Sequence, residues 1–170
     1  MITVFLAHGA SGTAASMTPH VSGLERRGIR ARAVSLPRGR ADSAVATYRA
    51  AAPPSADAVI GGHSFGGRVA SLLAAEVAYR GLVLLSYPLH PPGARDRWEV
   101  RTDHWPRIDC PVLLISGDRD PFASLPLLAR AVERLRDPEL VIMPGLGHVL
   151  GPVLDDVLDR LAAWVAAITP

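Results

Sequence analysis

Short runs of apolar residues alternate along this chain with longer segments in which apolar residues recur at helical spacing. Such runs are typical of strands buried on both faces, and their alternation with helices is typical of a mostly parallel sheet. Right-handed crossovers would then place helices on both faces, so we expect an α/β protein with three layers and about six strands. The pattern predicts strands at residues 2–7, 30–35, 58–61, 81–86, 111–116 and 140–143, and helices at residues 14–27, 42–51, 66–79, 125–136 and 153–168.

The last predicted helix, at residues 153–168, is the most regular part of this pattern. The segment 87–109 is the least regular part. One face of the helix at 153–168 is apolar throughout and should cover the sheet. The helix at 66–79 should end at Arg80-Gly81, where a basic last turn meets a capping glycine. Residues 87–109 contain four prolines and are long for a connection, so we expect an irregular loop there rather than a helix.

The length of 170 residues fits one domain, residues 1–170, which can bury a core without metal ions or disulfides. Cys110 is the only cysteine, so no internal disulfide can form, and we expect it to be a buried small hydrophobe. No apolar run approaches the roughly 20 residues that span a bilayer. Residues 2–7 lack the basic flank and cleavage site of a signal peptide. We therefore expect a cytoplasmic protein with no membrane partner.

The charge pattern argues against a nucleic-acid partner. All 18 basic residues are arginines, and lysine, asparagine and glutamine are absent, which is typical of a GC-rich, bacterial coding genome rather than of selection for phosphate binding. The net charge of +2 is small, and the arginines are dispersed among acidic residues.

A G-x-S-x-G motif at residues 62–66 follows the strand predicted at 58–61 and precedes a helical pattern. This context is typical of a nucleophile elbow, a strained turn that leaves room only for glycine two residues on either side of the serine. Free N–H groups at the start of the helix favour negative charge beside that serine. The motif predicts Ser64 as a nucleophile; the alternative is a glycine-rich turn with an incidental serine.

A serine hydroxyl is a poor nucleophile at neutral pH, so it needs a base and an acid that orients the base. Asp118 and Asp120 both follow the strand at 111–116. We favour Asp120, three residues after Gly117, as the acid, because Asp118 has an ordinary interpretation as a turn residue. His148 is the one histidine downstream of both the serine and the acid, and it is the predicted base.

Backbone N–H groups are expected to form an oxyanion hole. Ala10 lies in the loop after the first strand, and Phe65 directly follows Ser64, so their N–H groups are the predicted donors. The side chain of His8 is then structural, and His63 occupies the variable position of the elbow. No metal or other cofactor is required.

Further side chains are candidates for the substrate pocket. We name Ser11, Tyr87 and His90 as possible pocket residues. His20 and His104 could also line it, although a surface position is the simpler interpretation for His20, His90 and His104.

The order Ser64, Asp120, His148 is that of the α/β-hydrolase fold. Within this fold the sequence resembles a compact family that includes testis-expressed protein 30 and the hydrolase-like domain of a subunit of the non-specific-lethal histone acetyltransferase complex, with many bacterial members. The resemblance rests on residues 8–12, 62–71, 87–93 and 117–122. The third stretch, Tyr-Pro-Leu-His-Pro-Pro-Gly, is the most specific. Phe65 and Asp118 depart from the residues that the family favours.

This resemblance implies a compact α/β-hydrolase fold without a lid domain. Together with the three residues it predicts a serine hydrolase that cleaves a small-molecule ester or thioester through an acyl-enzyme. The alternative is a catalytically silent interaction module, because the family also includes scaffolds. A dienelactone-type hydrolase would be expected to carry cysteine in place of Ser64. The sequence gives no indication of the oligomeric state.

Overall fold

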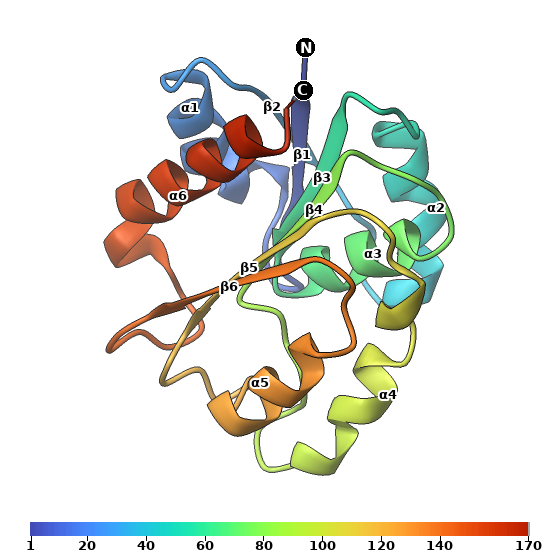
Figure 1. Ribbon diagram of the computed structural model, residues 1–170, viewed down its shortest axis with the longest axis vertical. Helices are drawn as coiled ribbons and strands as arrows, with labels where there is room; N and C mark the ends of the chain where they lie inside the picture. The colour runs from blue at the N-terminus through green and yellow to red at the C-terminus, as the bar shows by residue number, and fades with distance from the viewer. Residues whose placement is uncertain (170) are drawn as a thin grey trace.

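One sheet of six parallel strands forms the centre of the molecule in the computed structural model, which describes residues 1–169 (Figure 1). The strand order β2-β1-β3-β4-β5-β6 means that the chain starts inside the sheet, winds to one edge and then crosses to the other. This parallel sheet confirms the predicted fold class. The strands are β1 Thr3–Ala7, β2 Arg30–Val34, β3 Ala58–His63, β4 Gly81–Leu85, β5 Val112–Gly117 and β6 Pro138–Met143.

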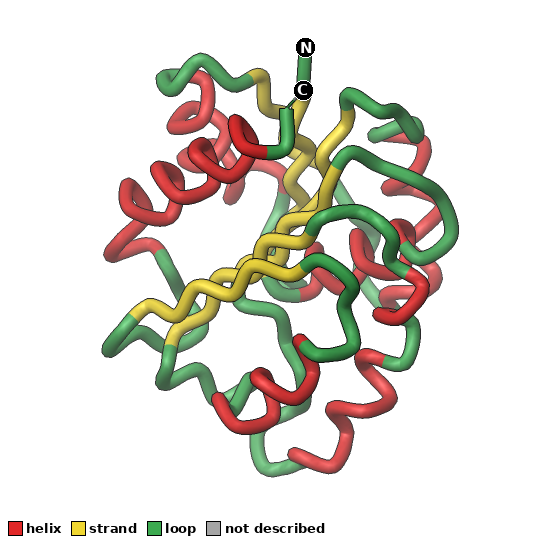
Figure 2. Tube along the Cα trace, in the orientation of Figure 1, coloured by secondary structure: helices red, strands yellow, loops and turns green. Residues whose placement is uncertain are grey.

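Helices cover both faces of the sheet, which Figure 2 shows as a twisted band between them. Helices α1 and α6 lie on one face, and α2, α3 and α5 lie on the other, with α4 packed against α5 (Figure 1). The α-helices are α1 Thr18–Glu25, α2 Ala41–Ala51, α3 Phe65–Ala74, α4 Trp98–Thr102, α5 Leu125–Val132 and α6 Leu154–Ala167.

The two faces of the sheet bury two separate apolar cores. In β1, Val4 and Leu6 belong to the core under α1 and α6, whereas Phe5 and Ala7 belong to the core under α2 and α3. This alternation follows from the two-residue repeat of a strand. Burial on both faces explains why a central strand such as β4 is apolar without interruption, whereas the edge strand β2 carries two exposed arginines. None of the helices in residues 1–169 combines the length and apolar character that crossing a bilayer requires.

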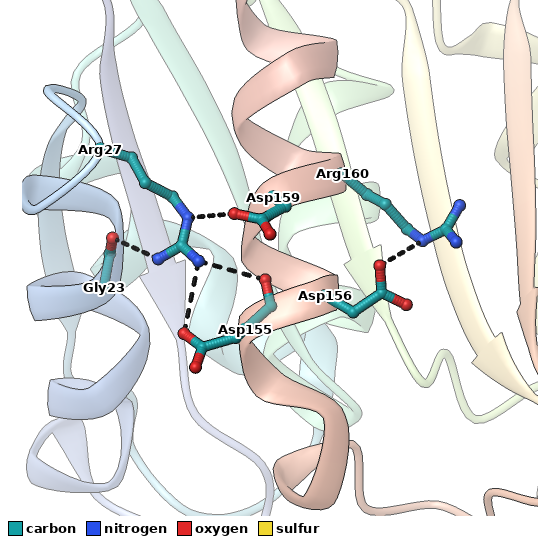
Figure 3. Close-up of polar contacts among 6 residues, drawn as sticks. All are labelled: Gly23, Arg27, Asp155, Asp156, Asp159 and Arg160. Carbon is teal, nitrogen blue, oxygen red and sulfur yellow. Dashed lines mark hydrogen bonds and ion pairs between the residues drawn. The ribbon is translucent and has the colours of Figure 1, made fainter.

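Helices α1 and α6 are joined by close packing and by one arginine. A Cβ atom at Gly23 would lie 2.3 Å from Cδ1 of Leu158, so the Leu158 side chain would have to shift to admit any other residue there. Arg27 then donates through Nε to Asp159 at 2.7 Å and through Nη2 to the Asp155 carboxylate at 3.3 Å (Figure 3). The face of α6 that the sequence predicted to be apolar therefore covers the sheet, and its acidic side holds α1.

Three predicted helices are shorter than expected, and one of them is α5, which ends at Val132 instead of Arg136. Residues 14–27 form a 3-10 turn at Ala14–Met17 and then α1, because Pro19 lacks an N–H and is accommodated only in the first turn of an α-helix. Helix α3 ends at Ala74 instead of Tyr79, and Gly81 begins β4 rather than capping the helix. The Tyr79 hydroxyl donates to the carbonyl of Ala52, so this residue is held by the neighbouring connection.

The prediction that residues 87–109 contain no helix is wrong. They include α4 and two 3-10 turns, Arg95–Arg97 and Trp105–Arg107. The prolines lie outside α4, and inside it the Thr102 hydroxyl donates to the carbonyl of Trp98, whose side chain is buried. The segment is therefore an ordered cover over the α3 side of the sheet.

Candidate active site

Ser64 lies at the turn between β3 and α3. Its backbone has φ 51° and ψ −115°, a strained conformation that residues with a side chain rarely adopt, and its N–H donates to the carbonyl of Leu85 at 2.9 Å. A Cβ atom at either Gly62 or Gly66 would lie 2.4 Å from the carbonyl oxygen of Ala7. The two glycines are therefore required because the elbow presses against the backbone of β1.

A continuous chain of hydrogen bonds joins Ser64, His148 and Asp120. His148 Nε2 lies 2.9 Å from Ser64 Oγ, and His148 Nδ1 lies 2.8 Å from Asp120 Oδ2. The other carboxylate oxygen of Asp120 accepts the N–H of Phe122 at 2.8 Å. Because Asp120 is buried and accepts at both oxygens, it favours the tautomer of His148 that carries its proton on Nδ1. Nε2 is then free to accept the proton of the serine hydroxyl.

The three side chains come from loops that follow β3, β5 and β6, and these loops meet because the strands are parallel. From the sequence, either Asp118 or Asp120 could be the carboxylate beside the histidine. Asp120 contacts His148, whereas Asp118 accepts the N–H of Gly145 at 2.8 Å and ties the loop after β5 to the loop after β6.

His63 holds the His148 loop, a role that the sequence reasoning missed. Its Nε2 donates to the carbonyl of His148 at 3.0 Å, and the two ring centroids are 5.1 Å apart. Burial lowers the pKa of His63, the hydrogen bond to that carbonyl opposes the shift, and the charge on His148 adds to it. His63 is therefore neutral and keeps the proton that this hydrogen bond needs. The G-x-S-x-G pattern gives no signal for this contact, because it depends on where the loop after β6 returns.

A cavity of about 430 Å³ opens beside Ser64. Ser11, one of the predicted pocket residues, lines it, and the ring of Phe122 lies 4.5 Å from that of His148 at its wall. Phe65 opens α3, so its N–H has no acceptor within the helix, and neither it nor the N–H of Ala10 is bonded to another of residues 1–169. The residues that line the cavity are Gly9, Ala10, Ser11, Gly12, Ser16, His63, Ser64, Phe122 and His148.

A second, more apolar cavity of about 270 Å³ adjoins the first, and the two share Gly9, Ser16 and His63. Burial, and then the charge on His63, lower the pKa of His20 to about 4, so this histidine is a neutral part of the wall. The remaining lining comes from the start of α1, the end of β4 and the start of α6: Met17, Pro19, Leu85, Val149, Leu150, Gly151 and Leu154.

Tyr87 and His90 do not line the cavity beside Ser64, unlike the expectation from the sequence. Both are buried, so the alternative of a surface position is also wrong for His90. The Tyr87 hydroxyl donates to the carbonyl of Arg101 at 2.6 Å. The N–H of His90 donates to the carbonyl of Phe122, and its Nε2 accepts the N–H of Ser124. Tyr87 thus holds α4, and His90 braces the loop that carries Asp120.

Two other histidines are structural. His8 Nε2 accepts the N–H of Leu36 at 3.0 Å, so its proton lies on Nδ1, which donates to the carbonyl of Gly9. His104 is buried, contrary to a surface position, and its Nε2 lies 2.8 Å from the hydroxyl of Ser71. Within residues 1–169, no three His, Cys, Asp or Glu side chains gather as metal ligands do.

Many solved structures share this fold. A monoacylglycerol lipase from Paleococcus ferrophilus matches with a TM-score of 0.82 at 16% identity, covering 98% of this chain and 95% of that chain. The dienelactone hydrolase from Anabaena variabilis matches with a TM-score of 0.77 at 20% identity, covering 98% and 86%. Est1E from Butyrivibrio proteoclasticus, with bound ferulic acid, matches with a TM-score of 0.74 at 17% identity, covering 98% and 90%.

At these identities the solved structures establish the fold, and the sequence match is more specific. A family model described as an alpha/beta hydrolase domain matches residues 31–153, which include Ser64, Asp120 and His148. This match spans more than half of the chain, and we conclude that the chain belongs to the alpha/beta hydrolase domain family.

Proposed function

We propose that this protein is a serine hydrolase that cleaves a small ester or thioester. The observation that carries the proposal is the unbroken hydrogen-bond chain from Ser64 through His148 to the buried Asp120, with the serine facing a cavity. A chain of this geometry activates a hydroxyl that is otherwise a poor nucleophile at neutral pH. The names of the structural relatives, a monoacylglycerol lipase and a dienelactone hydrolase, agree with ester chemistry.

In the proposed reaction Ser64 Oγ attacks the acyl carbon of the substrate, and His148 Nε2 takes its proton. The N–H groups of Ala10 and Phe65 stabilise the oxyanion that forms on the carbonyl oxygen. Asp120 stabilises the protonated imidazole and keeps it oriented. His148 then gives its proton to the departing alkoxide or thiolate, and the acyl group stays on Ser64. A water molecule, deprotonated by His148, attacks the acyl-enzyme; the bond to Ser64 Oγ breaks, His148 returns the proton to Oγ, and the acid is released.

The cavities support a short or medium acyl chain as the substrate group. The apolar cavity of about 270 Å³ adjoins the cavity at Ser64, so an aliphatic chain can enter it while the carbonyl lies at the serine. Its volume is below the roughly 300–1,000 Å³ of pockets that hold drug-sized ligands. We therefore expect activity to peak at acyl chains of a few carbons.

Labelling by a fluorophosphonate probe tests the proposal directly, because such a probe reacts covalently with an activated serine. The wild type should be labelled and Ser64→Ala should not, with unchanged circular dichroism. Ser11→Ala is the matched control, since it removes another serine of the same cavity and should label as the wild type does. Labelling of Ser64→Ala at the wild-type rate would exclude Ser64 as the nucleophile.

A panel of p-nitrophenyl esters and acyl thioesters from two to ten carbons identifies the substrate class. The interaction-module alternative, suggested by the resemblance to the non-specific-lethal complex subunit, predicts neither labelling nor saturable turnover. Folded wild-type protein that is inert in both assays would replace the hydrolase proposal with that alternative.

A further inference from the structure

Another cavity, lined by three arginines, lies between α3 and α4, apart from the site at Ser64. It has a volume of about 340 Å³ and shares no lining residue with the cavity at Ser64. Helices α3 and α4 lie on the same side of the sheet, one above the other in the view of Figure 1. The lining residues are Arg68, Pro91, Ala94, Arg97, Val100 and Arg101.

Three of these six residues are arginines, and none is acidic. Among residues 1–169, no carboxylate lies within ion-pair distance of Arg68, Arg97 or Arg101. The other arginine ion pairs of the chain show that carboxylates are available elsewhere, as at Arg27 with Asp155 and Asp159.

The acidic residues in and around α4 contact other partners or are exposed to solvent. Glu99 pairs with Arg134, and Asp103 lies 3.5 Å from Nδ1 of His104. Asp96 is exposed and does not line the cavity. The positive charge of the three guanidinium groups is therefore not neutralised by the residues around them.

Arg101 is held in place beside the other two arginines despite the repulsion between their charges. Arg101 Nη1 donates to the carbonyl of Pro88 at 2.7 Å, and the carbonyl of Arg101 accepts the Tyr87 hydroxyl. Burial and then the charge on Arg68 lower the pKa of Arg101, the Tyr87 phenol opposes this, and Arg97 lowers it further. Arginine stays protonated in such surroundings, so the repulsion persists until an anion relieves it.

We propose that this cavity binds the phosphoryl group of a small molecule. A phosphate monoester carries close to two negative charges and three terminal oxygens at neutral pH, and guanidinium groups bind such oxygens with two parallel hydrogen bonds. A single carboxylate has one charge and two oxygens, which leaves one of the three arginines without a partner. The apolar side chains of Pro91, Ala94 and Val100 give the remainder of the ligand a surface to pack on.

The position of the cavity separates this ligand from the acyl group that is cleaved. Arg68 follows Ser64 by four residues, which places it one turn along α3, but its side chain faces the α4 cavity instead of the serine. The phosphorylated ligand is thus an additional ligand, and its binding does not depend on whether Ser64 is a nucleophile.

Titration with inorganic phosphate at constant ionic strength tests the proposal, with ¹H–¹⁵N NMR spectra as the readout. We expect saturable shifts of the Arg68, Arg97 and Arg101 amide signals. Arg68→Gln and Arg97→Gln should each raise the Kd about tenfold, since each removes a charged hydrogen-bond donor. Arg97 is exposed, so its variant keeps the fold even if Arg68→Gln does not. Arg32→Gln, an exposed arginine on the edge strand β2, is the charge-matched control and should bind as the wild type does.

Three results would overturn the proposal. Shifts that rise linearly without saturation would show nonspecific screening, and an equal loss of affinity in Arg32→Gln would show that only the net charge matters. Acetate that binds as tightly as phosphate would show that the cavity recognises carboxylates and not phosphoryl groups.

Discussion

The cluster of Ser64, His148 and Asp120 at the carboxyl ends of the strands and the cluster of three arginines between α3 and α4 differ in how their polar groups are paired. In the Ser64 cluster, His148 and Asp120 are each hydrogen-bonded on both sides, and the carboxylate is buried with its oxygens satisfied. In the arginine cluster, three guanidinium groups line a cavity, and no carboxylate within residues 1–169 forms an ion pair with them. The polar groups of the first cluster are paired with one another, whereas the charges of the second cluster are balanced only when an anion binds.

This difference separates two kinds of functional surface. A closed network fixes proton positions before a substrate arrives, so the reaction requires little rearrangement of the protein. An open cluster of like charges instead stores repulsion that a ligand can relieve, which favours binding over chemistry. The two clusters therefore predict different responses to the loss of one member.

Removing the acid of the closed network should have the largest effect. Asp120→Asn keeps the shape of the side chain but no longer favours the tautomer that leaves Nε2 of His148 free, so kcat/KM for p-nitrophenyl acetate should fall roughly 10⁴-fold. Asp118→Asn is the matched control, because among residues 1–169 the Asp118 carboxylate accepts only the N–H of Gly145, and it should lose far less. The reverse ranking would assign the acid role to Asp118.

Acidification should destabilise the region behind the arginine cluster. Burial is the main cause that lowers the pKa of His104 to about 4, from an ordinary value near 6.5. The unfolded chain therefore takes up a proton at this residue before the folded protein does, and stability is lost as the pH falls from 6.5 to 4. His104 alone should contribute a loss of about 3 kcal/mol at pH 4.

The comparison with His104→Gln isolates this contribution. Glutamine retains a donor for the Ser71 hydroxyl but does not titrate, so urea unfolding of the variant should depend less steeply on pH between 4 and 6.5. An unchanged slope would show that His104 is not the group that takes up the proton.

The loss of His63 should have the smallest effect, because His63 is hydrogen-bonded to the backbone of His148 and not to the side chains of Ser64, His148 and Asp120 that form the hydrogen-bond chain. His63→Leu removes the hydrogen bond to the carbonyl of His148, and we expect kcat to fall about tenfold with little change in KM. His63→Gln can restore the donor and should recover most of the loss. A fall in kcat that glutamine does not reduce would mean that His63 contributes packing rather than positioning.

The strands could be predicted from the sequence because a central parallel strand is apolar on both sides and interrupts the helical period. The same reasoning placed the start of α3 well, since the elbow sets it, but extended the helix to Tyr79. The chain there contacts the connection after α2 through the Tyr79 hydroxyl, and sequence spacing does not show such a contact. The helix α4 was missed because four prolines in the segment suggested a loop.

At the candidate site, the order of Ser64, Asp120 and His148 along the chain was informative because parallel strands bring successive carboxyl ends together. The roles of His63 and His90 could not be predicted in this way. Both act through backbone carbonyl or N–H groups of distant loops, and a backbone partner leaves no mark on the sequence. The arginine cavity was missed for a related reason: Arg68 precedes Arg97 by 29 residues, so the sequence does not show that Arg68 joins Arg97 and Arg101.

The parallel sheet also sets the order in which this protein can assemble during synthesis. Every strand pairing among residues 1–169 joins segments separated by a crossover, so hairpins cannot nucleate the sheet, and such topologies fold slowly. A chain that leaves the ribosome from its N-terminus exposes Ser64 long before His148 and α6 exist. The nascent elbow therefore lacks the histidine that the proposed reaction requires, and we expect Ser64 to become reactive only when the final crossover closes the sheet.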